Sequence, residues 1–222
     1  MHRMLSTLVK TGFVAQDSDS RGYRLTLKLW RIGAVAVRDL DLVKTARPWL
    51  ERLVLDTGET PHLAMLDPSG GVVYISKVES PQSIRVQTQI GQISPSWCTA
   101  TGRILLAFDP AAAEKVLAAQ LEARTSKTVT DPRRIRLFLR DIAAKGYSVT
   151  KSENHPEIGG IAAPIRDHAG NVIASSGVAI PAFRMDRELV NRCVPRVLKA
   201  AAGISADLGY QPIEPGKVKR AA

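Results

Sequence analysis

Two short turn sequences constrain the fold of this chain more than any other feature. They read DPSGG at residues 67–71 and DHAGN at residues 167–171. Each turn lies between two strand-like apolar runs, which span residues 63–66 and 72–78 and residues 158–166 and 172–180. Gly, Asp, Asn and Pro between two such runs favour a tight reversal of the chain, so both segments predict β-hairpins and an antiparallel sheet.

Amphipathic helices are predicted on both sides of the hairpins. Apolar residues recur at helical spacing in five segments, at residues 42–55, 99–108, 111–121, 132–145 and 186–208. Residues 83–90 and 147–150 alternate in the manner of further strands. Helices at both ends with hairpins between them indicate an α+β fold, in which helices cover an antiparallel sheet, and not a repeated strand–helix–strand array.

The first 25 residues predict a small separate element. Apolar residues within 1–9 fall on one face of a helix that Gly12 ends, and residues 13–14 and 23–25 flank a polar turn. A helix followed by a basic hairpin is the second half of a winged helix, whose helix enters the major groove. In that arrangement Arg21 and Arg24 reach phosphates. A helix and hairpin packed on a larger core is the alternative.

Positive charge is concentrated in the same part of the chain. The net charge is +10, and residues 1–38 carry seven basic and two acidic side chains. A compact basic element attracts a polyanion, because neutralised phosphates release counterions. A solvated basic face that serves only solubility is an equally good interpretation of the charge alone.

Several classes of protein do not fit the sequence. Cys98 and Cys193 form no CxxC pair and no cluster with histidines, so neither a disulfide framework nor a metal site is expected. His62 and His155 have no Ser or Cys partner in a catalytic frame, so we expect no enzyme and no cofactor. Without a long apolar segment or a secretory signal, the chain is expected to be cytoplasmic and not membrane-bound.

Eight short stretches occur in one order over nearly the whole chain. They are HRMLSTL at 2–8, GFV at 12–14, GYRL at 22–25, RPWL at 47–50, TGET at 57–60, WCTATGR at 97–103, GYS at 146–148 and IAAPI at 161–165. Together they resemble the isocitrate lyase regulator (IclR) family of transcription factors. The resemblance implies a winged helix-turn-helix, a linker helix and a GAF-like effector-binding domain.

The resemblance also divides the chain and implies its partners. The implied parts are a partial winged helix-turn-helix at 1–25, a linker helix at 26–41, an effector-binding domain at 42–210 and a tail at 211–222. The implied partners are a double-stranded DNA operator, a second copy in a homodimer or tetramer, and a small-molecule effector. The residues expected to lie at the DNA are His2, Arg3, Arg21 and Arg24.

The resemblance implies about 25 further residues before Met1, which is enough for two helices of ordinary length. Those helices would orient the recognition helix. A lone helix and wing cannot bury enough apolar surface to form a stable module, so we expect the polypeptide as given not to bind an operator.

The start of the helix at residues 99–108 is the expected effector site. Helix starts offer unpaired N–H groups and a positive dipole end, which suit a carboxylate, and Thr99 and Thr101 add hydroxyl groups. Thr99 serving only as the cap of its own helix is the alternative. The residues that the resemblance implies at the effector are Thr99, Ala100, Thr101, Thr150, Gly160, Gly177 and Ala179.

Three of these residues are smaller than in relatives that bind small oxo acids. Gly160, Gly177 and Ala179 stand where Cys or Ser is common in those relatives. We therefore expect a roomier pocket and a larger, flatter carboxylate, with aromatic acids among the candidates. A register shifted by one residue would instead bring Ser175 or Ser176 into the pocket.

A ligand-responsive transcriptional regulator is thus the leading interpretation. The alternative is a truncated, stand-alone small-molecule-binding module without DNA binding. A third interpretation is a hydrolase or isomerase that works in the same pocket. The sequence argues against it, because it offers no nucleophile with a partnered base.

Overall fold

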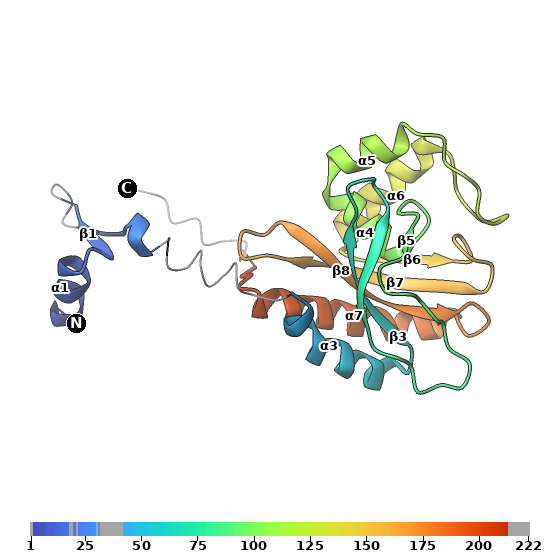
Figure 1. Ribbon diagram of the computed structural model, residues 1–222, viewed down its shortest axis with the longest axis horizontal. Coiled ribbons are helices and arrows are strands. Elements are labelled where there is room, and N and C mark those ends of the chain that lie inside the picture. The colour runs from blue at the N-terminus through green and yellow to red at the C-terminus, as the bar shows by residue number, and fades with distance from the viewer. Residues whose placement is uncertain (1, 18–19, 21, 30, 32–41, 213–222) are drawn as a thin grey trace. The chain divides into compact units, whose positions relative to one another are not determined.

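The computed structural model of the protein describes residues 2–17, 20, 22–29, 31 and 42–212. The chain divides into two compact units, Met1–Asp41 and Leu42–Ala222 (Figure 1). Most of the linker helix expected at 26–41, and most of the tail expected at 211–222, lies outside the described residues.

The first unit contains a helix and a two-stranded antiparallel sheet. Its elements are α1 (His2–Lys10), β1 (Val14–Gln16) and β2 (Tyr23–Leu25). The helix and hairpin that the sequence predicts are therefore present at the expected positions. Val14 is buried, whereas Met4, Leu25 and Leu27 are exposed, so this unit buries little apolar surface of its own.

The second unit is built on a six-stranded antiparallel sheet with the strand order β5-β4-β3-β8-β7-β6. The strands are β3 (Thr60–Leu66), β4 (Val72–Lys77), β5 (Ile93–Ser94), β6 (Ser148–Lys151), β7 (Ile158–Arg166) and β8 (Val172–Pro181). Both predicted hairpins are confirmed, since β3 pairs with β4 and β7 pairs with β8. Pairing of β3 with β8 joins the two hairpins in the middle of the sheet.

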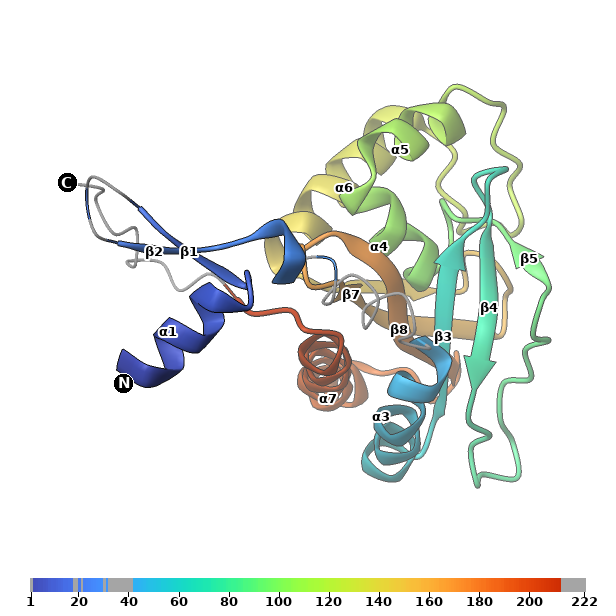
Figure 2. The same ribbon diagram turned by 60° about the vertical axis from the view of Figure 1, so that its left-hand side comes forward.

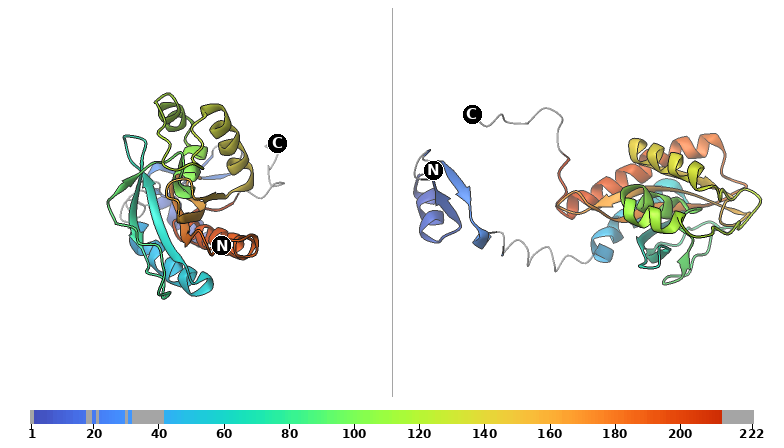
Figure 3. Two further views of the ribbon diagram at one scale, coloured as in Figure 1. Left: turned by 90° about the vertical axis from the view of Figure 1, so that its right-hand side faces the viewer. Right: turned by 90° about the horizontal axis from the view of Figure 1, so that it is seen from above.

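Helices cover both faces of this sheet, so the predicted α+β class is confirmed (Figure 2, Figure 3). They are α3 (Leu42–Thr57), α4 (Ala100–Phe108), α5 (Pro110–Leu117), α6 (Pro132–Lys145) and α7 (Arg187–Asp207). Helices α3 and α7 lie against one face, and α4 lies against the other, with α5 and α6 packed beside it. None of the described helices combines the length and apolar character that a membrane span requires.

The main core lies between the sheet and the pair α3 and α7. Leu50 of α3 and Ile204 of α7 meet Leu63 and Ile161 of the sheet, and all four side chains are fully buried. Because side chains alternate along a strand, the neighbours of Leu63 and Ile161 point to the opposite face, toward α4. That face carries the small and polar residues from which the candidate site is built.

Most helix ends follow from the sequence. The capping side chains at the helix starts are Thr99, Asp109, Asp131 and Asp186, and each accepts a hydrogen bond from a backbone N–H of the first turn. Helix α6 ends where it was expected to end, because Gly146 adopts the left-handed conformation with φ 77°. Helix α5 is shorter than predicted and ends at Leu117, not at residue 121.

The strand predicted at residues 83–90 is wrong. This segment is irregular, and only the two residues of β5 after it pair with β4. Its carbonyl groups accept hydrogen bonds from side chains: Val86 from Thr60, Thr88 from Lys77 and Ile84 from Arg184. These three carbonyl groups thus have hydrogen-bond partners outside a strand ladder, which an alternating sequence cannot reveal.

Candidate functional site

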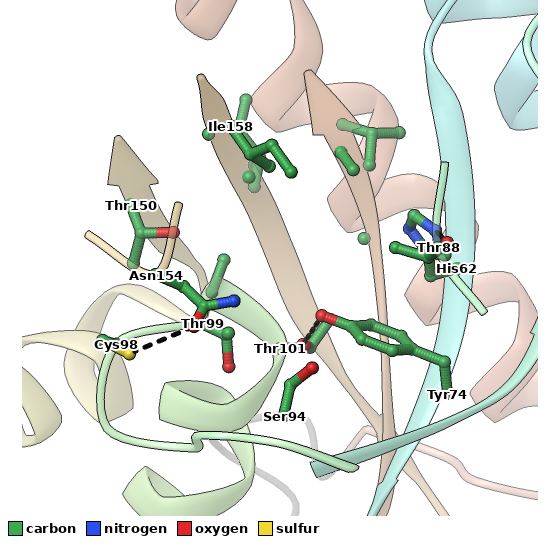
Figure 4. Close-up of a pocket in the computed structure, with 17 residues that line it drawn as sticks. His62, Tyr74, Thr88, Ser94, Cys98, Thr99, Thr101, Thr150, Asn154 and Ile158 are labelled. Atoms are coloured by element: carbon green, nitrogen blue, oxygen red, sulfur yellow. Dashed lines mark hydrogen bonds between the residues drawn. The ribbon is translucent and has the colours of Figure 1, made fainter. Parts of the chain in front are cut away.

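A cavity lies between the start of α4 and the sheet face formed by β3, β6, β7 and β8 (Figure 4). Its volume is about 90 Å³. All seven residues predicted at the effector line it: Thr99, Ala100, Thr101, Thr150, Gly160, Gly177 and Ala179. The fold therefore brings together residues that are up to 80 positions apart in the sequence, because cross-strand pairing sets Thr150 beside Gly160 and Gly160 beside Ala179.

The start of α4, which lines this cavity, has two free backbone donors. Thr99 has an extended conformation, and its Oγ1 accepts a hydrogen bond from the N–H of Gly102 at 3.3 Å and donates to the carbonyl of Pro95 at 2.8 Å. Its hydroxyl is thus occupied as a helix cap. The N–H groups of Ala100 and Thr101 have no acceptor among the described residues. Two such groups at the positive end of a helix suit an anionic oxygen.

The glycines of the site do not enlarge the cavity as the sequence suggested. A Cβ at Gly177 would lie 2.2 Å from the carbonyl oxygen of Ile161, and one at Gly160 would lie 3.3 Å from the Cβ of Ala100. Both glycines therefore allow close packing of β7, β8 and α4. Ser175 and Ser176 do not line the cavity, and Ser175 donates to the carbonyl of Thr101.

We expect substitution of the two glycines by alanine to lower the free energy of unfolding by different amounts. Gly177→Ala places a methyl group against the backbone of β7, which cannot move without disturbing the sheet, so we expect the free energy of unfolding to fall by about 2 kcal/mol. A Cβ at Gly160 comes no nearer than 3.3 Å to any neighbouring atom, so Gly160→Ala should cost less than about 1 kcal/mol. Urea denaturation measures both values, and equal costs would contradict the close approach at Gly177.

A polar group that is not among the predicted effector residues lies at one end of the cavity. His62 of β3 is 2% exposed, its Nε2 is hydrogen-bonded to the hydroxyl of Thr88, and its ring lies 5.0 Å from that of Tyr74. Burial lowers the pKa of His62 to about 3, with a smaller effect in the same direction from Lys77. The imidazole is therefore neutral at pH 7.

The sequence contains one indication that His62 faces the cavity, which is the alternation of residues along β3. Strand β3 begins at Thr60, so Thr60 and His62 share the face of Ala64, which is packed toward α4. The apolar run that predicts this strand begins at residue 63, which leaves His62 outside the predicted sheet. Thr88 lies in the segment at residues 83–90, where the predicted strand is wrong.

Asn154 lies at the opposite end of the cavity, beside Cys98 and Thr150 (Figure 4). The Cys98 thiol donates to the Asn154 side chain at 3.8 Å, and burial raises the pKa of this thiol to about 12. Cys98 is therefore a protonated hydrogen-bonding group at pH 7 and not a reactive thiolate.

A buried ion pair holds the loop that carries Asn154. The guanidinium of Arg103 donates to both carboxylate oxygens of Glu153, and its Nε donates to the carbonyl of Trp97 at 2.7 Å. Ser152, the residue before Glu153, has a φ of 60°. This left-handed backbone conformation costs a non-glycine residue about 1 kcal/mol of conformational free energy. The ion pair thus links α4 to the loop at residues 152–154.

The residues expected at DNA are described only in part. Arg3 of α1 and Arg24 of β2 are exposed, and Arg24 pairs across the hairpin with Ala15. His2 is the first residue of α1, and Arg21 lies outside the described residues.

Comparison with known proteins identifies the relatives of this chain. A family profile described as "Bacterial transcriptional regulator IclR C-terminal" matches residues 34–206. The transcriptional regulator KdgR of Escherichia coli K12 is 34% identical over 212 residues, which cover 95% of this chain and 80% of KdgR. The glycerol operon regulatory protein of Streptomyces coelicolor is 34% identical over 94% of this chain and 82% of its own length.

Solved structures agree with these matches. A crystal structure of an IclR transcriptional regulator from Silicibacter sp. TM1040 superposes with a TM-score of 0.85 at 28% identity, covering 96% of this chain and 84% of that one. An IclR homolog from Microbacterium hydrocarbonoxydans, crystallised in complex with 4-hydroxybenzoate, has a TM-score of 0.69 at 28% identity over 93% of this chain and 84% of its own.

The fold and these matches define a bacterial transcriptional regulator of the kind that carries an effector-binding domain, a class that does not consist of enzymes. The chain belongs to the IclR family. The resemblance stated from its short motifs is thereby confirmed.

Proposed function

We propose that the second unit binds a small carboxylate and that this binding controls the attachment of the chain to operator DNA. The observation that carries the proposal is the pair of unpartnered N–H groups of Ala100 and Thr101 at the cavity. A carboxylate there replaces two hydrogen bonds that the amides otherwise make only with water. It also meets the positive end of the α4 dipole.

The size of the cavity bears on the effector. Its volume of about 90 Å³ is smaller than the roughly 150 Å³ of an engineered cavity that holds benzene, and its two glycines do not widen it. These observations favour a compact acid. An aromatic acid is the second candidate, because a relative was crystallised in complex with 4-hydroxybenzoate.

The DNA-binding half of the proposal rests on the first unit. Arg3 and Arg24 provide exposed positive charge on a helix and on the hairpin that follows it. That order matches the second half of a winged helix, in which the helix reads the major groove and the hairpin contacts the backbone. We propose that two or four copies bind a palindromic site, and that the effector changes the spacing of their DNA-binding units.

A gel-shift experiment tests this function. DNA from upstream of the gene and its neighbours is titrated with this chain, and with the chain extended to an in-frame upstream start, with and without the acid that binds best. We expect the acid to change the midpoint of DNA binding by about fivefold or more. Arg24→Ala should weaken binding, whereas Arg52→Ala, an exposed arginine of α3, should not.

Two results would overturn parts of the proposal. Acid binding without any shift of operator DNA by either form would indicate a stand-alone small-molecule-binding module. DNA binding that no acid affects would remove the regulatory role of the cavity.

A further inference from the structure

The cavity has polar groups at two opposite ends and small residues between them (Figure 4). Thr150 and Asn154 lie at one end and His62 and Thr88 lie at the other, while the hydroxyl of Tyr74 lies between them, 3.5 Å from Oγ1 of Thr101. Gly160, Gly177 and Ala179 form the wall between the two ends. A ligand that only carried a carboxylate at the start of α4 would leave the His62 end in contact with an apolar part of the ligand.

The His62 end contains a hydrogen-bonding atom without a protein partner. Nε2 of His62 is bonded to the hydroxyl of Thr88, while Nδ1 has no hydrogen bond to any described residue. The side chain is nevertheless 2% exposed and lines the cavity. Nδ1 keeps accessible surface and His62 lines the cavity, so a ligand group can pair with this nitrogen and gain affinity.

The charges around this ring pair with one another. Lys77 Nζ donates to the carbonyl of Thr88 at 2.8 Å and forms an ion pair with Glu79. The low pKa of His62 keeps the ring itself neutral. This end of the cavity therefore presents neutral donors and acceptors, which suit a hydroxyl or carbonyl group and not a second carboxylate.

We propose that His62 determines effector specificity by hydrogen-bonding, through its free ring nitrogen, a hydroxyl or carbonyl group at the far end of a monocarboxylic acid. This proposal rests on the proposed function, because it requires that the cavity binds a carboxylate at all. The effector class is then a hydroxy or oxo acid whose two polar groups span the wall of small residues.

Calorimetric titration of the full chain with matched acids tests the proposal. One series is 4-hydroxybenzoate, benzoate and terephthalate, and the other is 3-hydroxypropionate, propionate and succinate. Within each series the far end carries a hydroxyl group, hydrogen or a carboxylate. In the series that fits, we expect the hydroxy acid to bind about tenfold more tightly than both companions, since losing one partner of a buried polar group has that effect.

Variants at the ring separate its role from that of the fold. His62→Leu should bind the hydroxy acid and its parent within about twofold of each other. His62→Asn, which places an amide near the position of Nδ1, should restore part of the preference. His155→Gln alters an exposed histidine outside the cavity and should keep the preference of the unaltered chain.

The outcomes distinguish this proposal from the proposed function. If acids bind but the hydroxyl group brings no gain, or if His62→Leu keeps the preference, the role of His62 is wrong and the carboxylate site stands. If a dicarboxylate binds best, the neutral character of this end is wrong. If no acid of either series binds, both proposals fail.

Discussion

Replacing Glu153 by Gln is expected to lower the free energy of unfolding by about 3 kcal/mol, one of the two largest effects that we predict. The side chain of Arg103 is 4% exposed and that of Glu153 is 14% exposed, so both charges have lost most of their water. Gln removes the negative charge and replaces one of the two acceptor oxygens by an amide NH2, which cannot accept a hydrogen bond from the guanidinium. An unpaired buried charge is costly, whatever the net contribution of the intact pair.

An exposed ion pair that also has two hydrogen bonds provides the control. Arg136 also makes two hydrogen bonds to the carboxylate of Glu114, but these side chains are 40% and 63% exposed. Glu114→Gln should therefore cost less than about 1 kcal/mol. Urea denaturation followed by circular dichroism measures both variants. Equal effects at Glu114 and Glu153 would contradict the burial of the Arg103 pair.

The second large effect is a dependence of stability on pH that originates at His62. Its pKa in the folded chain is about 3, below the value of 6.5 for an exposed histidine. Between these values the unfolded chain binds a proton that the folded chain does not, so stability falls as the pH drops below about 6.5. At pH 5 the expected loss is about 2 kcal/mol.

His62→Gln should remove this contribution. The measured quantity is the free energy of unfolding of the variant minus that of the unaltered chain, and we expect it to rise by about 2 kcal/mol between pH 7 and pH 5. Lys77, Glu79 and Tyr74, the ionisable neighbours of His62, are present in both chains, so their own titration largely cancels. A difference that does not vary with pH would mean that His62 is accessible to water.

Local sequence patterns predicted most elements because their causes are local. The turns at residues 67–71 and 167–171 form hairpins, and Asp186 and Gly146 mark helix ends, since a turn or cap is decided by a few adjacent residues. The strand prediction at residues 83–90 is wrong because the conformation of this segment depends on distant residues. Its backbone partners are the side chains of Thr60, Lys77 and Arg184, which are distant in sequence.

The candidate site likewise contains features that local sequence determines and features that long-range contacts determine. The start of α4 could be predicted, because Thr99 is a good helix cap and the free N–H groups follow from any helix start. The tight packing at Gly177 could not, because it depends on the carbonyl of Ile161 in the neighbouring strand. His62 and Asn154 enter the cavity through strand register and a loop held by Arg103, which no single segment encodes.

The central claim is that a carboxylate binds at the free amides of Ala100 and Thr101, and amide NMR shifts of the labelled chain test it most directly. On titration with 4-hydroxybenzoate or 3-hydroxypropionate, we predict that these two N–H signals are among those that shift most. The N–H of Arg133 at the start of α6 is already bonded to Asp131 and should not shift. Acid binding that leaves the Ala100 and Thr101 signals unchanged would contradict the account.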